Sequence, residues 1–427
     1  MYHNHISLRQ VGNDSKMEEL RFNFRDVFRS ARYAFSAKKI ANHFFGLAAA
    51  YLIHEVLVYL SLTTAGIDQV STFWKQYGLR PVSPLAMGDW PVLTQVAIGI
   101  SPLVLFVCFF VSSAMVSKIT LEQLKGNPFY SIGDAKTFIA KRWVSVFGTL
   151  IGFVLIFILL MLVPVTVGLL GKIPVVGQFI TMLTAILLPL AFIVGLLALY
   201  QILSLFISLF FAPSVVAVAD SDSFETIYQI YSMIWNRPWR IVIYEELLLL
   251  TKLISTSIWA IFCLIGTTLV LLPIRLLIPA DMAQIMGQAD VLTGGLVSKI
   301  SDLGLFSSWE YVFETTDLES MPLKIAGFFM ALTILAIFGL VLAYLLSIAS
   351  VGNTIIYTVL RYQINGENVL EEEDIAPMET TDADLSDEKI SDQTDANQTD
   401  MDQAGSGQDE TGQSETASAD QSANTED

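Results

Sequence analysis

Six stretches of this chain are almost wholly apolar, and each is long enough to cross a lipid bilayer. A helix needs about 20 apolar residues to span the ~30 Å hydrocarbon core. Hydrophobic residues make up 53% of the chain and the mean hydropathy is +0.57, whereas soluble domains are about 45–50% apolar. The sequence therefore predicts an all-α fold, a polytopic membrane helical bundle. The expected transmembrane helices lie at about 41–63, 92–116, 144–170, 178–211, 241–278 and 324–349.

Two local features bear on the shape and packing of these spans. The stretch 178–211 would be about 50 Å long as a straight helix, so it is expected to tilt, to kink at Pro189 or to project beyond the bilayer. Gly148 and Gly152 form a G-x-x-x-G pattern, which permits close approach of a second helix. We expect ordinary internal helix packing at these glycines.

Basic residues favour one orientation in the membrane. With both termini in the cytoplasm, the inner segments hold 17 Lys and Arg residues and the outer loops hold 6. Cytoplasmic loops of membrane proteins carry the excess of Lys and Arg. Residues 1–40 contain no early apolar run of the kind found in a cleavable signal peptide. The sequence therefore predicts a retained first span and two cytoplasmic termini.

Three of the expected cytoplasmic segments carry amphipathic helical patterns. The clearest begins with Asp222 and Glu225, which have the spacing of a capping box. An apolar stripe at helical spacing follows. It consists of Phe224, Ile227, Tyr228, Tyr231, Ile234 and Trp235. A basic amphipathic helix is expected over 21–39 and a weaker one over 132–143, all three lying in the membrane interface.

Each amphipathic segment ends in a basic or aromatic corner, which is typical of anchoring at an anionic membrane surface. The expected interfacial anchors are Arg25, Arg29, Lys38, Lys39, Lys141, Arg142, Trp143, Arg237, Trp239 and Arg240. The corners lie about 100 residues apart and each precedes a pair of spans. One interpretation is a threefold parallel repeat of interfacial helix plus helical hairpin. The other is that inward-facing loops collect basic and amphipathic residues independently.

The acidity of the chain belongs to its C-terminal tail. Residues 367–427 contain 20 acidic residues and one basic residue, within a total net charge of −17. With almost no aromatic residues this tail cannot bury a core, and it is predicted to be disordered. The expected domains are a cytoplasmic N-terminal segment (1–40), a six-span domain (41–350) and a largely disordered acidic cytoplasmic tail (351–427). The tail either binds a basic protein partner or is a solvated segment without a specific partner.

Ionisable residues inside the spans are the candidates for a functional site, because a charge in hydrocarbon is costly. They are His54, Glu55, Glu245, Glu246 and Lys252. Glu55 and Lys252 are expected at similar depth, which allows an ion pair between them. The functional interpretation is a proton or ion path through His54, Glu55 and Lys252. The structural interpretation, which we favour, is a buried pair or snorkelling groups that fix helix packing.

Other chemistries find no support in the sequence. Cys108 and Cys263 lie in expected spans and are interpreted as small apolar residues rather than as a disulfide or metal pair. The chain lacks the H-E-x-x-H, Walker and G-x-S-x-G motifs. We therefore expect no enzymatic activity, no metal and no cofactor. The lipid bilayer is the expected partner, nucleic acid is not, and the oligomeric state is left open.

The run Phe211-Ala212-Pro213-Ser214-Val215-Val216, the helix pattern after it and Trp239-Arg240 before a span support a resemblance. Together they resemble uncharacterised bacterial six-span integral membrane proteins, including the membrane domain associated with glycerophosphodiester phosphodiesterases. The pattern covers about 90–270. The resemblance implies a helical bundle in the bacterial cytoplasmic (inner) membrane and carries no catalytic residues.

Two functions from different classes follow. The first is a non-enzymatic membrane protein that organises lipid or binds a partner through its cytoplasmic face. The alternative is a small transporter or permease with a polar path near Glu55 and Lys252. A water-accessible polar cavity that reaches the middle of the membrane favours transport. A dry bundle with a broad basic and aromatic inner surface favours the organising role.

Overall fold

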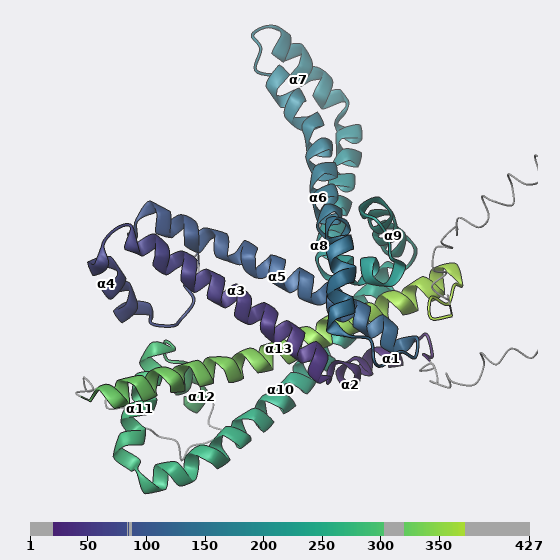
Figure 1. Ribbon diagram of the computed structural model, residues 1–427. Coiled ribbons are helices and arrows are strands. Elements are labelled where there is room, and N and C mark those ends of the chain that lie inside the picture. Colours follow the sequence, from purple (N-terminus) through teal and green to yellow (C-terminus); the bar gives the residue numbers. More distant parts are fainter. Residues whose placement is uncertain (1–19, 83, 85–87, 303–319, 372–427) are drawn as a thin grey trace, which may run out of the picture. The chain divides into compact units, whose positions relative to one another are not determined.

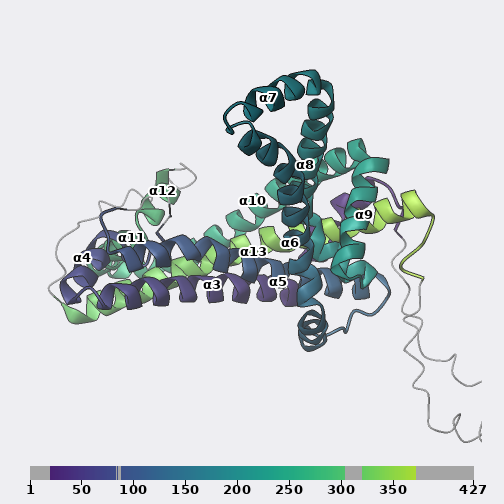
Figure 2. The same ribbon diagram turned by 90° about the horizontal axis from the view of Figure 1, so that it is seen from above.

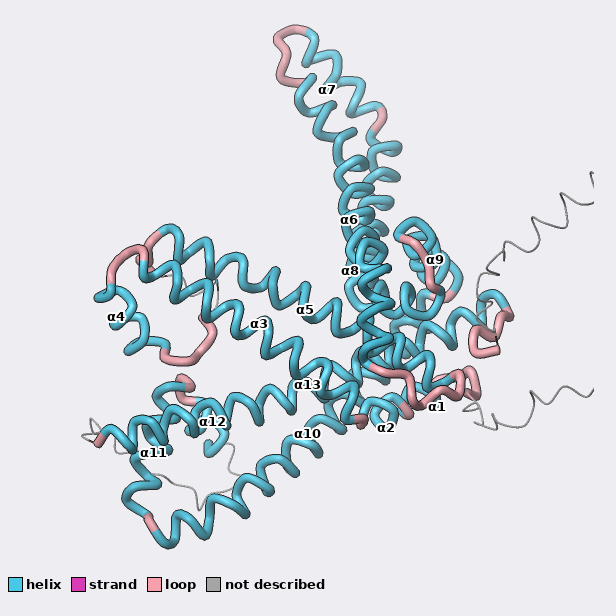
Figure 3. The backbone as a smooth tube through the Cα atoms, viewed as in Figure 1, coloured by secondary structure: helices cyan, strands magenta, loops and turns pink. Residues whose placement is uncertain are grey.

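The computed structural model describes residues 20–82, 84, 88–302 and 320–371, and the regular elements within them are all helices (Figure 1). The chain divides into two units, Met1–Glu372 and Glu373–Asp427, and all described residues belong to the first. Most of the predicted acidic tail lies outside the described residues. Short loops and turns make most of the connections between the helices (Figure 3).

Six helices are long and apolar enough to cross a bilayer, which confirms the predicted multi-pass membrane architecture. They are α3 (Ala37–Thr63), α5 (Val92–Leu124), α6 (Ile132–Leu170), α8 (Leu188–Ala219), α10 (Pro238–Leu277) and α13 (Met321–Asn365). Seven shorter helices complete the described part of the chain. They are α1 (Arg25–Phe28), α2 (Ser30–Ala34), α4 (Ile67–Tyr77), α7 (Val176–Ile186), α9 (Ser223–Asn236), α11 (Pro279–Leu292) and α12 (Leu296–Asp302).

The buried core lies where the later halves of three spans meet. Val116 of α5, Val215 of α8 and Val351 of α13 belong to one buried apolar cluster. Elsewhere the spans expose their apolar side chains, as α10 does at Leu269. In a bilayer such surfaces face lipid, so exposure there carries no cost.

Helix pairs account for most of the packing. α3 contacts α5 along the chain's first hairpin, and the two run side by side in both views (Figure 1, Figure 2). α6 contacts α8, and α7 connects them at the end of that hairpin. α11 contacts α13. Neighbouring antiparallel spans with short connections are typical of helical membrane bundles.

Helix α13 continues well past the predicted end of the sixth span. Its 45 residues correspond to about 68 Å, roughly twice the hydrocarbon thickness. Residues 351–360 are all buried, and the helix ends at Gly366 with a positive φ of 75°, a conformation that favours glycine. The helix therefore continues through the predicted domain boundary at 350/351. Polar residues that follow Ser350 pack against other helices, as Asn353 does against Phe210 of α8.

Proline marks two of the helix breaks. Of the three alternatives for 178–211, the structure has a break next to Pro189, because α7 ends at Ile186 and α8 begins at Leu188. α10 begins at Pro238, directly after Arg237 has left helical geometry with φ −139°. Proline suits the first turn of a helix because its missing N–H has no intrahelical partner there.

The three expected interfacial segments join their spans in different ways. Residues 132–143 are the first turns of α6 and run into the span without a break. α9 is separated from α10 at Arg237. Residues 21–39 form no single helix, because α1 and α2 are short and the chain leaves helical geometry at Phe35. These differences argue against a repeat of one structural unit.

Candidate functional site

His54 on α3 holds a segment that follows α4. The Val82 backbone N–H donates to His54 Nε2 at 3.3 Å, so this nitrogen is the unprotonated acceptor of a neutral imidazole. Ser101 on α5 donates its hydroxyl to the Ala97 carbonyl, which leaves Ser101 Oγ to accept from His54 Nδ1 at 2.6 Å. Both ring nitrogens are therefore used in structural hydrogen bonds.

Two tyrosines of α3 fasten the same segment. Tyr51 donates to the Leu79 carbonyl at 2.9 Å and Tyr59 donates to the Gly78 carbonyl at 2.8 Å. The Leu79 N–H donates to the Leu292 carbonyl of α11 at 2.9 Å. Gly78 has φ +59°, and a Cβ there would lie 2.7 Å from the Leu292 carbonyl oxygen, so only glycine fits. His54, Tyr51 and Tyr59 thus together hold residues 78–82 against α3.

The ion pair that a similar depth of Glu55 and Lys252 would allow is not formed among the described residues. Within the described residues, no ion pair or hydrogen bond joins their side chains. Glu55 Oε1 and Glu245 Oε1 are buried without a hydrogen-bond partner, and Glu246 is exposed. The five intramembrane polar residues therefore form no continuous path in the described part of the chain.

Lys39 was expected at the membrane surface and is buried. Its side chain is only 1% exposed. Nζ donates to the Tyr33 carbonyl at 3.0 Å and to Gln123 Oε1 at 2.8 Å. The preceding residue, Lys38, donates to the Pro128 and Tyr130 carbonyls at 2.7 and 3.2 Å. Both lysines hold α3 against α5 and the loop after it, because α3 starts at Ala37 and turns Lys39 inward.

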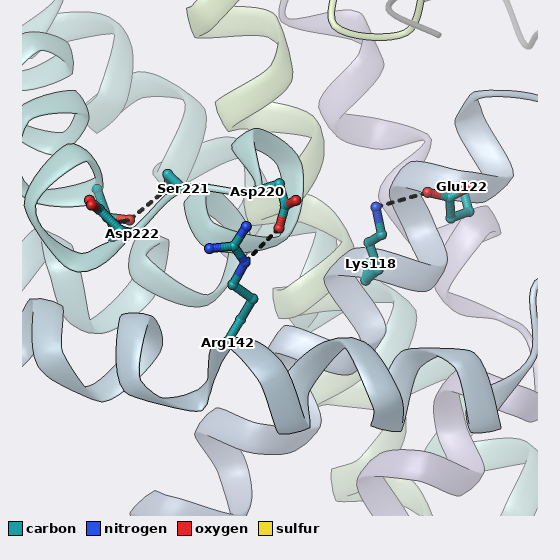
Figure 4. Close-up of polar contacts among 7 residues, drawn as sticks. Lys118, Glu122, Arg142, Asp220, Ser221 and Asp222 are labelled. Carbon is teal, nitrogen blue, oxygen red and sulfur yellow. Dashed lines mark hydrogen bonds and ion pairs between the residues drawn. The ribbon is translucent and has the colours of Figure 1, made fainter. Parts of the chain in front are cut away.

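The other basic corners combine internal contacts with exposed side chains. Arg142 Nε lies 2.8 Å from Asp220 Oδ1, and Lys118 pairs with Glu122 at 3.0 Å (Figure 4). Arg29 lies 3.7 Å from Asp26. The anchors that stay exposed are Arg25, Lys141, Trp143, Trp239 and Arg240.

The corner before α10 contacts the end of α13. Arg237 donates to the Gln363 carbonyl at 3.3 Å, and Arg240 donates to Gln363 Oε1. Gln363 Nε2 in turn donates to the Phe22 carbonyl at 2.8 Å. This network explains how Arg237 and Arg240 bring together segments that lie far apart in the sequence.

Helix α9 packs lengthwise on α6 through the predicted glycine pair. A Cβ at Gly148 would overlap Ser223, and a Cβ at Gly152 would overlap the side chain of Ile227. The expectation of ordinary internal packing at these glycines is confirmed. Asp222 caps α9 by accepting from the Glu225 N–H at 2.8 Å. The Glu225 side chain accepts from Gln229 instead of completing a capping box.

Half of the predicted apolar stripe of α9 faces outward. Thr226, Ile230, Met233 and Ile234 are buried, whereas Phe224, Tyr228 and Trp235 are 81%, 67% and 79% exposed. α9 therefore buries the face next to the predicted stripe and leaves an aromatic row uncovered. The sequence did not distinguish these faces, because apolar residues occur on both.

Beyond Gly152 a groove of about 740 Å³ opens between α6, α8 and α9. Its lining residues are Ile156, Leu159, Leu160, Val163, Leu197, Tyr200, Gln201, Tyr228, Tyr231, Ser232, Trp235 and Asn236. Helices α6 and α9 approach closely where α6 carries Gly148 and Gly152. Further along α6, the larger side chains from Ile156 to Val163 line the groove. None of the lining residues is ionised at neutral pH.

A buried amide forms the floor of this groove. Gln201 is 3% exposed; its Nε2 donates to the Phe153 carbonyl at 2.7 Å, and its Oε1 accepts from the Tyr231 hydroxyl. Burial raises the pKa of Tyr231 above its ordinary value, which keeps the hydroxyl a neutral donor. The Tyr200 and Tyr231 rings stack with centroids 5.7 Å apart. Sequence reasoning missed Gln201, whose signal is a lone amide within the apolar run of α8.

A second groove of about 400 Å³ lies between α3 and α4 and is lined by residues that include Tyr59, Trp74 and Lys75. Neither groove includes Glu55 or Lys252. Cys108 and Cys263 are both free thiols. Among the described residues, no three His, Cys, Asp or Glu side chains gather where a metal ion would bind.

Comparison with known proteins adds no relative. No protein-family model, no curated protein and no solved structure matches this chain. The resemblance to bacterial six-span proteins therefore stays an expectation.

Proposed function

We propose that this chain is a non-enzymatic protein of the bacterial cytoplasmic membrane that organises lipid at the inner leaflet, with both termini in the cytoplasm. The observation that carries the proposal is the uncovered aromatic row of α9, Phe224, Tyr228 and Trp235, followed by exposed Trp239 and Arg240. Large exposed aromatic patches mark interaction surfaces. Beside membrane spans, their natural partner is the lipid headgroup region.

Charge supports lipid with an anionic headgroup as the partner. Arg25 and Arg32 are exposed beside Phe24 and Phe28, which are about half exposed. Lys141 and Trp143 repeat this combination at the start of α6. A basic residue near an anionic surface contributes about 1 kcal/mol, and the aromatic rings add contact area at the interface. The three basic and three aromatic side chains together would give a measurable preference for anionic lipid.

Lipid selectivity measured with spin-labelled lipids in reconstituted vesicles tests the proposal. We expect phosphatidylglycerol to be enriched over phosphatidylcholine in the shell that contacts the protein. The variant Phe224→Ala/Trp239→Ala, and separately Arg25→Gln/Arg32→Gln, should reduce the enrichment. Phe224 belongs to the exposed aromatic row but does not line the groove between α6, α8 and α9. Phe192→Ala is the matched control, because Phe192 is similarly exposed but lies within the apolar run of α8. Equal selectivity in all four proteins would refute the proposal.

The permease alternative has no contact in the described residues that favours it. Glu55 and Lys252 make no pair, and neither groove includes them. It stays a prediction, as does a basic protein partner of the acidic tail. A flux assay on Glu55→Gln separates the two functions, since a folded variant that loses proton-coupled uptake would favour transport.

A further inference from the structure

We propose that the groove between α6, α8 and α9 binds one uncharged lipid of the diacylglycerol class, with an acyl chain against α6 and the glycerol ester end against α9. The proposal rests on the proposed function in that lipid is the partner in both. The two surfaces share Tyr228 and Trp235. They differ in charge, because the surface of the proposed function includes basic side chains whereas the lining of the groove includes none.

The two walls of the groove have different chemistry. The wall from α6 and α8 is aliphatic where it is formed by Ile156, Leu159, Leu160, Val163 and Leu197. These side chains belong to membrane-spanning helices, so hydrocarbon rather than water is the medium next to them. A volume of about 740 Å³ lies within the ~300–1,000 Å³ typical of small-ligand sites. This wall fits an acyl chain.

The wall from α9 offers neutral hydrogen-bonding groups. Tyr228 is 67% exposed, and its hydroxyl makes no hydrogen bond within the described residues. Asn236 Nδ2 donates to the Ser232 carbonyl and hydroxyl at 2.8 and 3.2 Å, which leaves the Asn236 amide oxygen and the Ser232 hydroxyl proton for a ligand. These groups match the ester carbonyls and free hydroxyl of a diacylglycerol.

Charge excludes the common phospholipids from the inside of the groove. None of its twelve lining side chains is ionic, and a phosphate placed there would lie unpaired in an apolar site, which is strongly unfavourable. The floor cannot compensate, because Gln201 already uses its amide on Phe153 and Tyr231. The groove therefore distinguishes a neutral lipid from an anionic lipid with the same chains.

Photolabelling of the full-length protein tests this inference. The probe is a diacylglycerol with a diazirine on one acyl chain, in phosphatidylcholine vesicles, and the labelled peptides are identified by mass spectrometry. We expect labelling concentrated in 156–163 and 228–236. Excess unlabelled diacylglycerol should compete, and phosphatidylglycerol with the same chains should not. Labelling spread evenly over all spans would overturn the proposal, and so would equal competition by phosphatidylglycerol.

Two variants locate the site. Leu160→Trp fills the groove and should lower labelling about tenfold. Leu199→Trp is the matched control on the exposed surface of α8 outside the groove and should label like the native chain. Tyr228→Phe removes one hydroxyl without changing shape and should weaken competition about fivefold, which is ~1 kcal/mol. Unchanged labelling in Leu160→Trp would overturn the site assignment.

The two lipid proposals fail separately. Loss of phosphatidylglycerol enrichment with intact groove labelling would refute only the organising function. Intact enrichment with diffuse labelling would refute only the groove.

Discussion

At the scale of single residues, burial decides what a charged side chain does in this protein. Lys38 and Lys39 are adjacent, yet Lys39 is internal and Lys38 binds loop carbonyls. Arg142 and Asp220 form a partly exposed pair, which is expected to contribute only about 0–1 kcal/mol. Charge counts treat adjacent lysines alike, so the sequence could not separate exposed basic residues from internal ones.

Replacing Lys39 with alanine is expected to destabilise the fold by about 1–3 kcal/mol, the cost of leaving buried hydrogen-bond partners unsatisfied. The partners left behind are Gln123 Oε1 and the Tyr33 carbonyl. The thermal midpoint in detergent, followed by the loss of monodisperse protein on heating, measures the effect. Lys141→Ala removes an exposed lysine and should change the midpoint little. A smaller effect at Lys39 than at Lys141 would contradict its structural role.

His54→Leu should release the segment 78–82 while the bundle stays folded. The variant removes the acceptor of the Val82 N–H and the partner of Ser101, so two structural hydrogen bonds of about 0.5–1.5 kcal/mol each are lost. Limited proteolysis and amide hydrogen exchange should both increase in residues 78–82. An unchanged exchange rate at Val82 would show that Tyr51 and Tyr59 hold the segment without His54.

At the scale of elements, the spans were predictable and their ends and packing faces were not. A run of 20 apolar residues is a local property, and each of the six expected runs lies mainly within a long helix. The end of α13 depends on other helices, because Asn353 donates to the Phe210 carbonyl at 3.0 Å and His43 pairs with Ser350 at 3.0 Å. Polar residues that would end a lipid-facing helix make hydrogen bonds to other helices inside the bundle, which hydropathy does not reveal.

The contact between α6 and α9 depends on small residues in α6, so Gly148→Val should separate the two helices. Overpacking of this kind costs about 1–3 kcal/mol. Gly168→Val is the matched control on the same helix, because a Cβ at Gly168 meets nothing within 4 Å. We expect a lower thermal midpoint and higher amide hydrogen exchange across α9 only in Gly148→Val. Equal exchange in both variants would refute the packing role of Gly148.

At the scale of the whole molecule, composition predicted the fold class but not the site. Backbone polar groups in lipid must be paired within helices, so long apolar runs identify the class. They carry no information on where the helices leave a groove. The groove is formed by three helices, and a count of intramembrane charges does not detect the buried amide of Gln201 at its floor. The charged residues that the sequence does single out, Glu55 and Lys252, lie apart from it. The groove that we propose as a lipid site is therefore defined by the packing of three helices and not by ionisable residues.

The packed part of the chain extends past Ser350, because α13 runs to Asn365. A chain that stops after Ser350 follows the predicted domain boundary but loses residues 351–360, all of them buried, and the core partners of Val116 and Val215. A typical domain has a free energy of unfolding of only ~5–15 kcal/mol, and the loss of these core contacts should leave the shorter chain unstable. We therefore expect it to aggregate on size-exclusion chromatography. A chain that stops after Glu372 keeps Val369 and Leu370, which are also buried, and should elute as monodisperse protein with the thermal midpoint of the full chain. A monodisperse peak from the shorter chain would mean that the last part of α13 is dispensable and that the core is held by α5, α6 and α8 alone.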